Sequence, residues 1–398
     1  MTRIGMACTI CGKHQAFSYD QVTCICGGTL LVQYDMELAA KTMTKQAIQS
    51  RSASMWRYKE LLPVSSPEGI VTLGEGWTPL TRINIQEIGL PISHVWIKRE
   101  ELNPTGSFKA RGMSVAVSLL KERGVQCAAI SSNGNAASAL AAYAGCAGIE
   151  AFVFLPEDCP PLIVHECLSY GARTFRVQGL IQDASQWVEV GKQLRGWSSV
   201  ATLKEPGRVE GKKTMGFELA EQWGWKLPSV IIYPTGGGSG LIGMWKAFHE
   251  LKQLGMISDP MPRMVSVQDA GCSPLVSAMG KPVPVLDAPA ATGMRVPWPP
   301  DLDLLVRILK ESGGTAVAVR QVEIDEAQRN LGYRGVSSSP EGAATLAGLL
   351  KLCEEGWIRP DDSVVLFNTC HGLKYGKSLD LKGNPLLTNL NELFNKNC

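Results

Sequence analysis

Lys109 is the residue of this sequence best placed for covalent chemistry. It lies in the stretch N-P-T-G-S-F-K-A-R-G at residues 103–112, where a glycine-containing loop passes into a predicted helix that runs to about Arg123. A lysine at such a turn can point into a cleft. A solvated lysine at a helix start is the alternative, but it fits less well beside phenylalanine and small residues. An amine in a cleft can form a Schiff base with a carbonyl compound.

Two further loops each join a predicted strand to a predicted helix and could bind anions. Residues 131–137 read S-S-N-G-N-A-A, and their backbone N–H groups, with the positive helix end, would face an anion such as a carboxylate. An ordinary helix cap is the alternative. Residues 234–241 read P-T-G-G-G-S-G-L, and this run of glycines would let the backbone wrap a phosphate group. The Rossmann and Walker patterns are both absent, so we expect neither a dinucleotide nor a nucleoside triphosphate.

The three loops together indicate one cofactor. A Schiff-base lysine, a loop for a carboxylate and a cradle for a single phosphate are what pyridoxal 5'-phosphate and an amino-acid substrate require. We therefore predict a pyridoxal-phosphate enzyme that acts on a small amino acid.

The sequence resembles the tryptophan-synthase-β superfamily of pyridoxal-phosphate enzymes, and within it the threonine synthases, over nearly its whole length. The similar segments are C-G-G-T-L-L at 26–31, G-E-G-W-T-P-L at 74–80, S-F-K at 107–109, S-N-G-N at 132–135, E-G-K-K-T at 210–214, the glycine run at 236–240 and T-C-H-G-L-K at 369–374. The resemblance implies a lyase of amino-acid biosynthesis that eliminates phosphate from the γ-carbon of O-phosphohomoserine and adds water at the β-carbon. It also implies a homodimer.

The resemblance assigns roles around the cofactor. Lys109 would hold the cofactor as a Schiff base and later move the α-proton, with Phe108 beside the pyridine ring. Asn135 would hydrogen-bond the ring hydroxyl oxygen, and Thr369 would face the ring nitrogen. A hydroxyl there, unlike a carboxylate, does not keep the ring protonated, which favours elimination and replacement over transamination. The residues around the cofactor phosphate would be Gly236, Gly237, Gly238, Ser239 and Gly240.

The substrate residues are implied in the same way. Ser132, Asn133 and Gly134 would receive the substrate carboxylate, and Lys204 and Arg208 would lie on the side of its phosphate. The sequence departs from the family pattern N-S-x-N-P-x-R here, because residues 202–208 read T-L-K-E-P-G-R. Glu205 would place a carboxylate beside the substrate phosphate, which costs affinity unless Lys204 or Arg208 compensates.

A second hypothesis follows from Glu205. It keeps the cofactor and proposes β-elimination or β-replacement on serine, threonine or a related amino acid, as in dehydratases and cysteate synthases. Gly179-Leu-Ile-Gln182 in place of G-N-F-D, and Ala110 where aspartate is common, are further departures on the substrate side. A non-catalytic relative that retains the cofactor cleft is a third possibility.

Three other residues could be taken for catalytic groups. His371 could shape the pocket or be a structural histidine. Cys272 and Cys370 lack a recognisable histidine partner in the sequence, so packing roles are expected for both.

Four cysteines near the start of the chain predict a ribbon-like module over residues 1–35. They form the pairs Cys8-Thr-Ile-Cys11 and Cys24-Ile-Cys26, separated by a polar stretch too short for a core of its own. Four thiolates can hold a structural zinc ion that replaces such a core. A degenerate ribbon without metal remains equally open, because C-x-C is a less usual spacing.

Composition and element order set the fold class. The chain has 398 residues, 45% of them hydrophobic, and 39 basic against 37 acidic residues. This balance argues against nucleic acid or a membrane as a partner, and the sequence offers no spanning segment or leader, so we expect a cytoplasmic protein. Short apolar runs at 95–98, 128–130, 151–155, 230–233, 264–267 and 364–367 alternate with helical stretches, which predicts an α/β fold.

We therefore expect two open, mostly parallel twisted sheets flanked by helices, together with the ribbon. The predicted large domain comprises residues 36–115 and 212–398 and anchors the cofactor. The predicted small domain, residues 116–211, carries the carboxylate loop. Residues 36–66 are expected to form a polar, helix-compatible connector.

Overall fold

Uninterrupted apolar runs form the centre of the larger sheet. The computed structural model describes residues 2–84, 92, 94–284 and 291–376. Strands β10 (Val230–Pro234) and β13 (Val364–Asn368) are buried along their whole length, as expected for parallel strands covered on both faces. The strand order is β12-β11-β10-β13-β5-β4, in which β4 alone among these described strands runs antiparallel to its neighbour. The other strands are β12 (Thr315–Val319), β11 (Arg263–Asp269), β5 (His94–Arg99) and β4 (Leu80–Asn84).

Alternate side chains of these strands enter two different cores. Ile231 and Phe367 pack on one face of the sheet with apolar residues of the helices α7, α8 and α10. Ile232 and Leu366 pack on the other face with α11 and α12. This two-residue alternation is what a sheet between two helical layers requires. The helices are α7 (Gly207–Gln222), α8 (Ser239–Gln253), α9 (Pro274–Ala278), α10 (Leu302–Glu311), α11 (Gln321–Gly332) and α12 (Pro340–Glu354).

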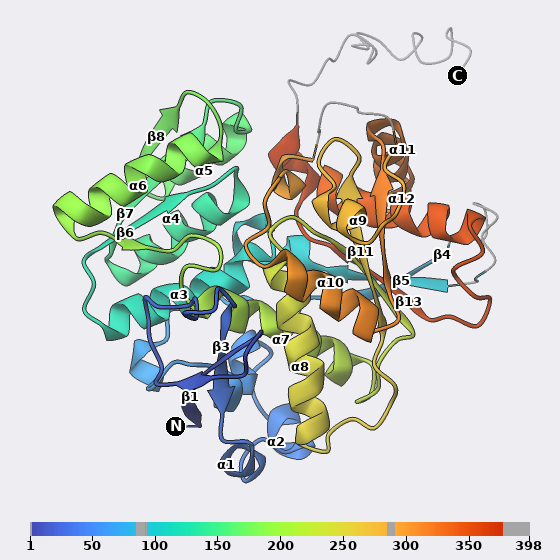
Figure 1. Ribbon diagram of the computed structural model, residues 1–398, viewed down its shortest axis with the longest axis horizontal. Helices are drawn as coiled ribbons and strands as arrows, with labels where there is room; N and C mark the ends of the chain where they lie inside the picture. Colours follow the sequence, from blue (N-terminus) through green and yellow to red (C-terminus); the bar gives the residue numbers. More distant parts are fainter. Residues whose placement is uncertain (1, 85–91, 93, 285–290, 377–398) are drawn as a thin grey trace, which may run out of the picture.

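A second sheet forms the smaller lobe, drawn in turquoise and green at the upper left of Figure 1. Its parallel strands have the order β8-β7-β6-β9. Helices α3, α4 and α5 share one core with it, and α6 packs on the opposite face. The elements are β6 (Cys127–Ser131), β7 (Glu150–Pro156), β8 (Arg173–Val177), β9 (Ser198–Ser199), α3 (Lys109–Glu122), α4 (Asn135–Ala147), α5 (Pro161–Ser169) and α6 (Ile181–Arg195).

The N-terminal residues form a small antiparallel sheet of order β2-β1-β3. Its buried side chains, among them Met6, Leu30 and Val32, belong to the same apolar cluster as residues of α7 and α8, so the ribbon shares the core of the larger lobe. The expected polar connector after it is partly wrong, since Met55–Leu61 forms a largely buried 3-10 segment. The elements are β1 (Arg3–Cys8), β2 (His14–Gln15), β3 (Leu30–Tyr34), α1 (Met36–Ala40) and α2 (Lys45–Gln49).

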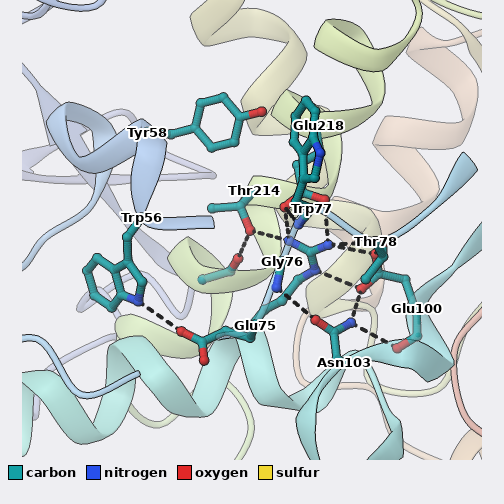
Figure 2. A network of polar contacts seen from close by, with 12 residues as sticks. Trp56, Tyr58, Glu75, Gly76, Trp77, Thr78, Glu100, Asn103, Thr214 and Glu218 are labelled. Carbon is teal, nitrogen blue, oxygen red and sulfur yellow. Dashed lines mark hydrogen bonds and ion pairs between the residues drawn. The ribbon is translucent and has the colours of Figure 1, made fainter. Parts of the chain in front are cut away.

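A buried polar network ties the segment G-E-G-W-T-P-L to the helices around it (Figure 2). Glu75 accepts hydrogen bonds from Trp56, from Ser114 on α3 and from Tyr143 on α4. Glu218 of α7 accepts one from the backbone N–H of Trp77 at 2.7 Å. Because both carboxylates are fully buried and hydrogen-bonded, the network fixes the relative positions of α3, α4 and α7.

The predicted fold class, with two mostly parallel sheets and a cysteine ribbon, is confirmed. All strands of the smaller sheet fall inside residues 127–199, within the predicted small domain, while the division into domains stays a prediction. Across the part of the chain that the structure describes, no helix combines the length and apolar character needed to cross a membrane.

Candidate active site

A cavity of about 400 Å³ opens where loops from both lobes meet. Its wall comprises residues that follow β6, β10 and β13 and residues at the starts of α3, α4 and α8, which is the edge at which open α/β sheets bind ligands. Its size suits a small ligand. The active-site residues predicted from the sequence all line it: Phe108, Lys109, Ser132, Asn133, Gly134, Asn135, Lys204, Arg208, Gly236, Gly237, Gly238, Ser239, Gly240 and Thr369. Their individual roles stay predictions.

Lys109 is the first residue of α3, and its side-chain nitrogen lies 4.1 Å from the centre of the Phe108 ring. The backbone N–H of Phe108 donates to the carbonyl of Thr369 at 3.0 Å, which holds this turn against the loop after β13. Burial lowers the pKa of Lys109 to about 8, and the positive charge of Arg208 acts in the same direction. An amine with this pKa is partly neutral at physiological pH, and the neutral form is the nucleophile that a Schiff base needs.

The glycine run forms a tight turn between β10 and α8. Gly238 has a φ of 77°, and a Cβ atom at this position would lie 2.4 Å from a methyl carbon of Leu305. Only glycine satisfies both conditions easily. Ser239 then begins α8, whose first N–H groups lack partners within the helix and can donate to a phosphate.

Three cations line this cavity: Lys109, which is half-buried, and Arg208 and Lys212, which are buried. Among the described residues, Lys212 has no carboxylate within ion-pair distance, and its ammonium donates to Ser239 Oγ at 2.7 Å. Burial lowers the pKa of Lys212 strongly, and the charges of Arg208 and Lys109 lower it further. Buried cations without acidic partners are costly unless an anion binds them. The residues therefore fit a cofactor that carries a phosphate group.

Close packing of α3 on α7 brings Lys109 and Arg208 to the same cavity. A Cβ atom on Gly211 would lie 2.1 Å from the carbonyl oxygen of Arg111, so a larger residue would push the two helices apart. Arg208, in the first turn of α7, donates to the carbonyl of Val200 at 2.8 Å. Burial lowers its pKa to about 10.

Glu205 differs from the prediction. Its carboxylate was expected beside the substrate phosphate, but this side chain caps α7 instead. Its Oε2 accepts from the N–H of Gly207 at 2.6 Å and its Oε1 from the N–H of Arg208 at 2.8 Å. It lies in a narrow gap next to Val22 and Leu30 of the ribbon and does not line the cavity. The positive helix end and the unpaired N–H groups explain this orientation.

The carboxylate loop ends at the start of α4. Ser132 Oγ accepts from the N–H of Gly134 at 3.1 Å, which closes a local turn. Asn135 is the first residue of α4, and its side-chain amide donates to Tyr375 Oη at 2.8 Å. Ser132 and Asn135 thus lie at the N-terminal end of α4, a helix of 13 residues whose first N–H groups favour an anion.

Thr369 and Glu341 also line the cavity. Thr369 is buried and follows β13 directly. Glu341 Oε1 accepts from the N–H of Gly293 at 2.8 Å, whereas its Oε2 is buried with no hydrogen-bond partner among the described residues. Tyr375 lies beside this carboxylate: burial raises the pKa of the Tyr375 hydroxyl, and the charge of Glu341 raises it further.

The other proposed reactive groups are structural in this fold. His371 Nδ1 accepts from the N–H of Leu373 at 3.3 Å, caps a 3-10 turn and does not line the cavity. Cys272 is also buried outside it. Cys370 lines the cavity, but burial raises the pKa of its thiol above the usual range, so it is a poor nucleophile.

Several cavity residues were missed by the sequence analysis. Lys212, Glu341 and Tyr375 carry polar groups into the wall, and residues 296–300 form much of the rim, including the exposed Trp298. Lys212 belongs to the E-G-K-K-T motif. This motif was one of the segments that resemble the threonine synthases, but it did not indicate a role for this lysine.

The four N-terminal cysteines converge at one end of the ribbon. Their sulfur atoms all lie within 4.8 Å of one another, with distances of 3.4 Å for Cys8 and Cys26, 3.5 Å for Cys11 and Cys26, and 3.8 Å for Cys11 and Cys24. These distances are too long for disulfide bonds. The cluster can hold a metal ion.

The comparisons with known proteins agree with this geometry. A family model described as pyridoxal-phosphate dependent enzyme matches residues 71–369. The chain is 38% identical over 378 residues to the threonine synthase of Methanocaldococcus jannaschii, covering 92% of each chain. It is 36% identical over 381 residues to the threonine synthase of Methanosarcina acetivorans, covering 93% of this chain and 92% of that one.

Solved structures show the same fold at lower sequence identity. The processed form of threonine deaminase isoform 2 from Solanum lycopersicum has a TM-score of 0.61 and 20% identity, over 74% of this chain and 79% of that one. Diaminopropionate ammonia lyase from Escherichia coli has a TM-score of 0.64 and 17% identity, over 78% of this chain and 92% of that one. The chain therefore belongs to the family of pyridoxal-phosphate dependent enzymes and, within it, groups with the threonine synthases.

Proposed function

We propose that this enzyme converts O-phosphohomoserine and water to threonine and inorganic phosphate. The orientation of Glu205 carries the proposal. Because its carboxylate caps α7 outside the cavity, it does not oppose a phosphate there, and Arg208 presents a buried positive charge to the ligand. The relatives named threonine synthase support the same activity.

Substrate binding is assigned to two ends of the cavity. The start of α4, with Ser132, Asn133 and Gly134, would receive the α-carboxylate through N–H groups and the positive helix end. Arg208 and the exposed Lys204 would bind the substrate phosphate. Binding of both the carboxylate and the phosphate would hold the substrate in one orientation, with its α-carbon towards Lys109.

When bound, the cofactor would supply an electron sink for the carbanion character that develops at the substrate, after the substrate amine has displaced Lys109 from it. The Lys109 amine would then accept the α-proton and return it later, because it is the basic group at this point of the wall. A proton leaves Cβ, the Cγ–O bond breaks and phosphate leaves with the bonding electrons. Cγ then takes up a proton, and water adds at Cβ, giving its hydroxyl group to this carbon and releasing its other proton. Thr369 would face the ring nitrogen without keeping it protonated.

A substrate assay tests the proposal. Purified holoenzyme should release threonine and phosphate from O-phosphohomoserine in equal amounts, and Arg208→Gln should lower kcat/KM at least about a hundredfold because it removes a buried charge-assisted contact. Lys109→Ala should abolish the visible absorbance of the attached cofactor. Lys121→Ala is the matched control, since Lys121 is exposed on the same helix.

The runner-up function is an outcome of the same assay. If O-phosphohomoserine is not turned over and serine or threonine instead yields pyruvate or 2-oxobutyrate, the enzyme is a dehydratase-like lyase. Gln182 and Ile181, which stand in place of the family's usual residues, line the cavity and would then set that specificity.

We also propose that the cysteine ribbon holds a structural zinc ion. Four sulfur ligands at about 2.3 Å from a tetrahedral zinc lie about 3.8 Å apart, close to the sulfur distances between these cysteines. The backbone N–H of Ile10 donates to Cys8 Sγ at 3.4 Å, a contact that stabilises a thiolate ligand. Metal analysis of the purified protein should find one zinc per chain.

A homodimer, which the resemblance implies, is proposed as the assembly. Light scattering on the holoenzyme measures its mass, and a value near that of one chain, 43.0 kDa, would contradict it.

A further inference from the structure

We propose that the zinc-held ribbon is a support for residues 202–208, and that metal occupancy thereby sets how tightly the substrate phosphate is bound. Loss of the metal should loosen this segment while the cofactor stays attached at Lys109. The inference rests on the proposed function only in taking residues 202–208 as the substrate side of the cavity. It assigns the ribbon a role in the active site although no cysteine of the ribbon lines the cavity.

The ribbon packs directly against this segment. Val22, Leu30 and Val32 of the ribbon are buried in the same apolar cluster as Leu203 and Val209. The two sets face each other across a narrow gap. The side of residues 202–208 that faces away from the cavity is therefore held by the ribbon.

Leu203 shows why this support is needed. Its φ is 54°, a left-handed conformation that branched side chains rarely adopt, yet its side chain is buried with only 6% exposed. Such a conformation persists when surrounding packing determines it. Thr202 and Lys204, the residues on either side, both line the cavity. The packing of Leu203 on the ribbon therefore presents its two neighbours to the ligand.

A second contact reaches the rim of the cavity. Asp301 Oδ2 accepts hydrogen bonds from Thr9 Oγ1 at 3.3 Å and from the N–H of Thr29 at 3.4 Å. The same carboxylate caps α10 through the N–H of Leu304, at 3.1 Å from Oδ1. Pro300, the preceding residue, lines the cavity. The ribbon thus touches two separate parts of the wall.

The metal would determine the shape of the ribbon at both contacts. Thr9 follows Cys8 directly, and Thr29 lies three residues after Cys26. Backbone hydrogen bonds close each turn, from the Gly12 N–H to Cys8 and from the Gly27 N–H to Cys24, and one bond, from the Thr9 N–H to the Thr29 carbonyl at 2.9 Å, joins the two turns. A tetrathiolate ion would add a second link between the turns at the sulfur atoms, as it does in small metal-held modules.

Hydrogen exchange on the holoenzyme tests this coupling without relying on any substrate. A Cys11→Ser and Cys26→Ser double variant removes two exposed ligands, and Cys146→Ser is the control, because Cys146 is exposed on α4 outside the ribbon. We expect the double variant to lose zinc and to exchange about tenfold faster in peptides covering residues 202–208. Peptides of α3 and the visible cofactor absorbance should not change. Absence of zinc in the wild type, or unchanged exchange at 202–208 after zinc loss, overturns the proposal.

Leu203→Ala gives a second variant that keeps all four cysteines. It should retain zinc, and both this variant and the zinc-free enzyme should raise KM for O-phosphohomoserine at least fivefold with kcat within about twofold. A rise in KM that is accompanied by loss of the cofactor absorbance would indicate general unfolding and contradict the proposal. A wild type that does not turn over O-phosphohomoserine refutes the proposed function alone, because the exchange experiment still reports on the ribbon. If the cysteine double variant does not fold, the same experiments are done on wild-type enzyme from which a chelator has removed the zinc.

Discussion

Lys212 Nζ lies 2.7 Å from Ser239 Oγ and joins the middle of α7 to the start of α8 below the glycine run. Lys213, the next residue, points elsewhere and pairs with Glu210 at 2.6 Å and Glu250 at 3.0 Å. Two adjacent lysines of one motif thus have different surroundings. Of these two lysines, Lys212 lines the cavity, where its charge can bind an anion, and Lys213 does not.

Lys212→Met should weaken cofactor binding. A hydrogen bond to a charged group contributes about 1.5–3 kcal/mol, so the Kd for pyridoxal phosphate should rise about tenfold to a hundredfold. Titration of the apoenzyme, followed by visible absorbance, measures this Kd. Lys252→Met is the control, because Lys252 is exposed in the last turn of α8. Equal Kd values for wild type and Lys212→Met would refute the role of this lysine.

Glu205→Ala should lower stability without improving substrate affinity. The change removes the acceptor for the N–H groups of Gly207 and Arg208, which should cost about 1 kcal/mol of unfolding free energy. If the carboxylate instead faced the substrate phosphate, the same change would lower KM for O-phosphohomoserine. Steady-state kinetics and urea unfolding of one preparation separate these outcomes.

Attachment of the cofactor to the apoenzyme should depend on pH through Lys109. Its pKa of about 8 is below the ordinary value, so the charged form is disfavoured and the neutral amine predominates above pH 8. Below pH 8 the rate should fall about tenfold per unit, because only the neutral amine attacks the carbonyl carbon. Stopped-flow absorbance between pH 6 and 9.5 measures the profile. A rate that keeps rising to pH 9.5 would indicate an unshifted lysine.

Glu218→Gln should destabilise the fold strongly. Both partners of the Arg111 and Glu218 ion pair are fully buried and 2.6 Å apart, and Lys98 lies 3.0 Å from the same carboxylate. Burial alone would raise the pKa of Glu218, but the charges of Arg111 and Lys98 lower it to about 2. Removing one member of such a pair costs about 3–5 kcal/mol.

The matched control for this change is Glu323→Gln. Glu323 pairs with Arg320 at 2.8 Å on the surface, so its loss should cost less than about 1 kcal/mol. Urea unfolding compares the two variants. Similar losses of unfolding free energy in the two variants would show that burial of the Arg111 network contributes little to stability.

Local sequence signals sufficed for much of this protein. Apolar β-branched runs predicted the buried parallel strands, since such runs are stable only where both faces are covered. Glycines and small residues after two of these strands predicted loops that bind anions, and Lys109 stood at the start of a helix where its side chain could enter a cleft. Cysteine spacing predicted a cluster of four sulfur atoms. Each of these inferences depends on residues close together in the chain.

The tertiary structure decided where several side chains point, because these directions depend on how the helices and loops pack. Adjacent residues of a helix point about 100° apart, so the packing of α7 determined that Lys212 faces the cavity and Lys213 does not. The capping requirement of α7 turned Glu205 away from the ligand, although proline and an acidic residue before a helix are signals that could have indicated this cap. Leu203 and the rim at 296–300 gave no chemical signal, because their positions depend on segments distant in sequence. The sequence by itself thus determined which chemistry this protein carries, and the packing of distant segments decided which charges reach the substrate.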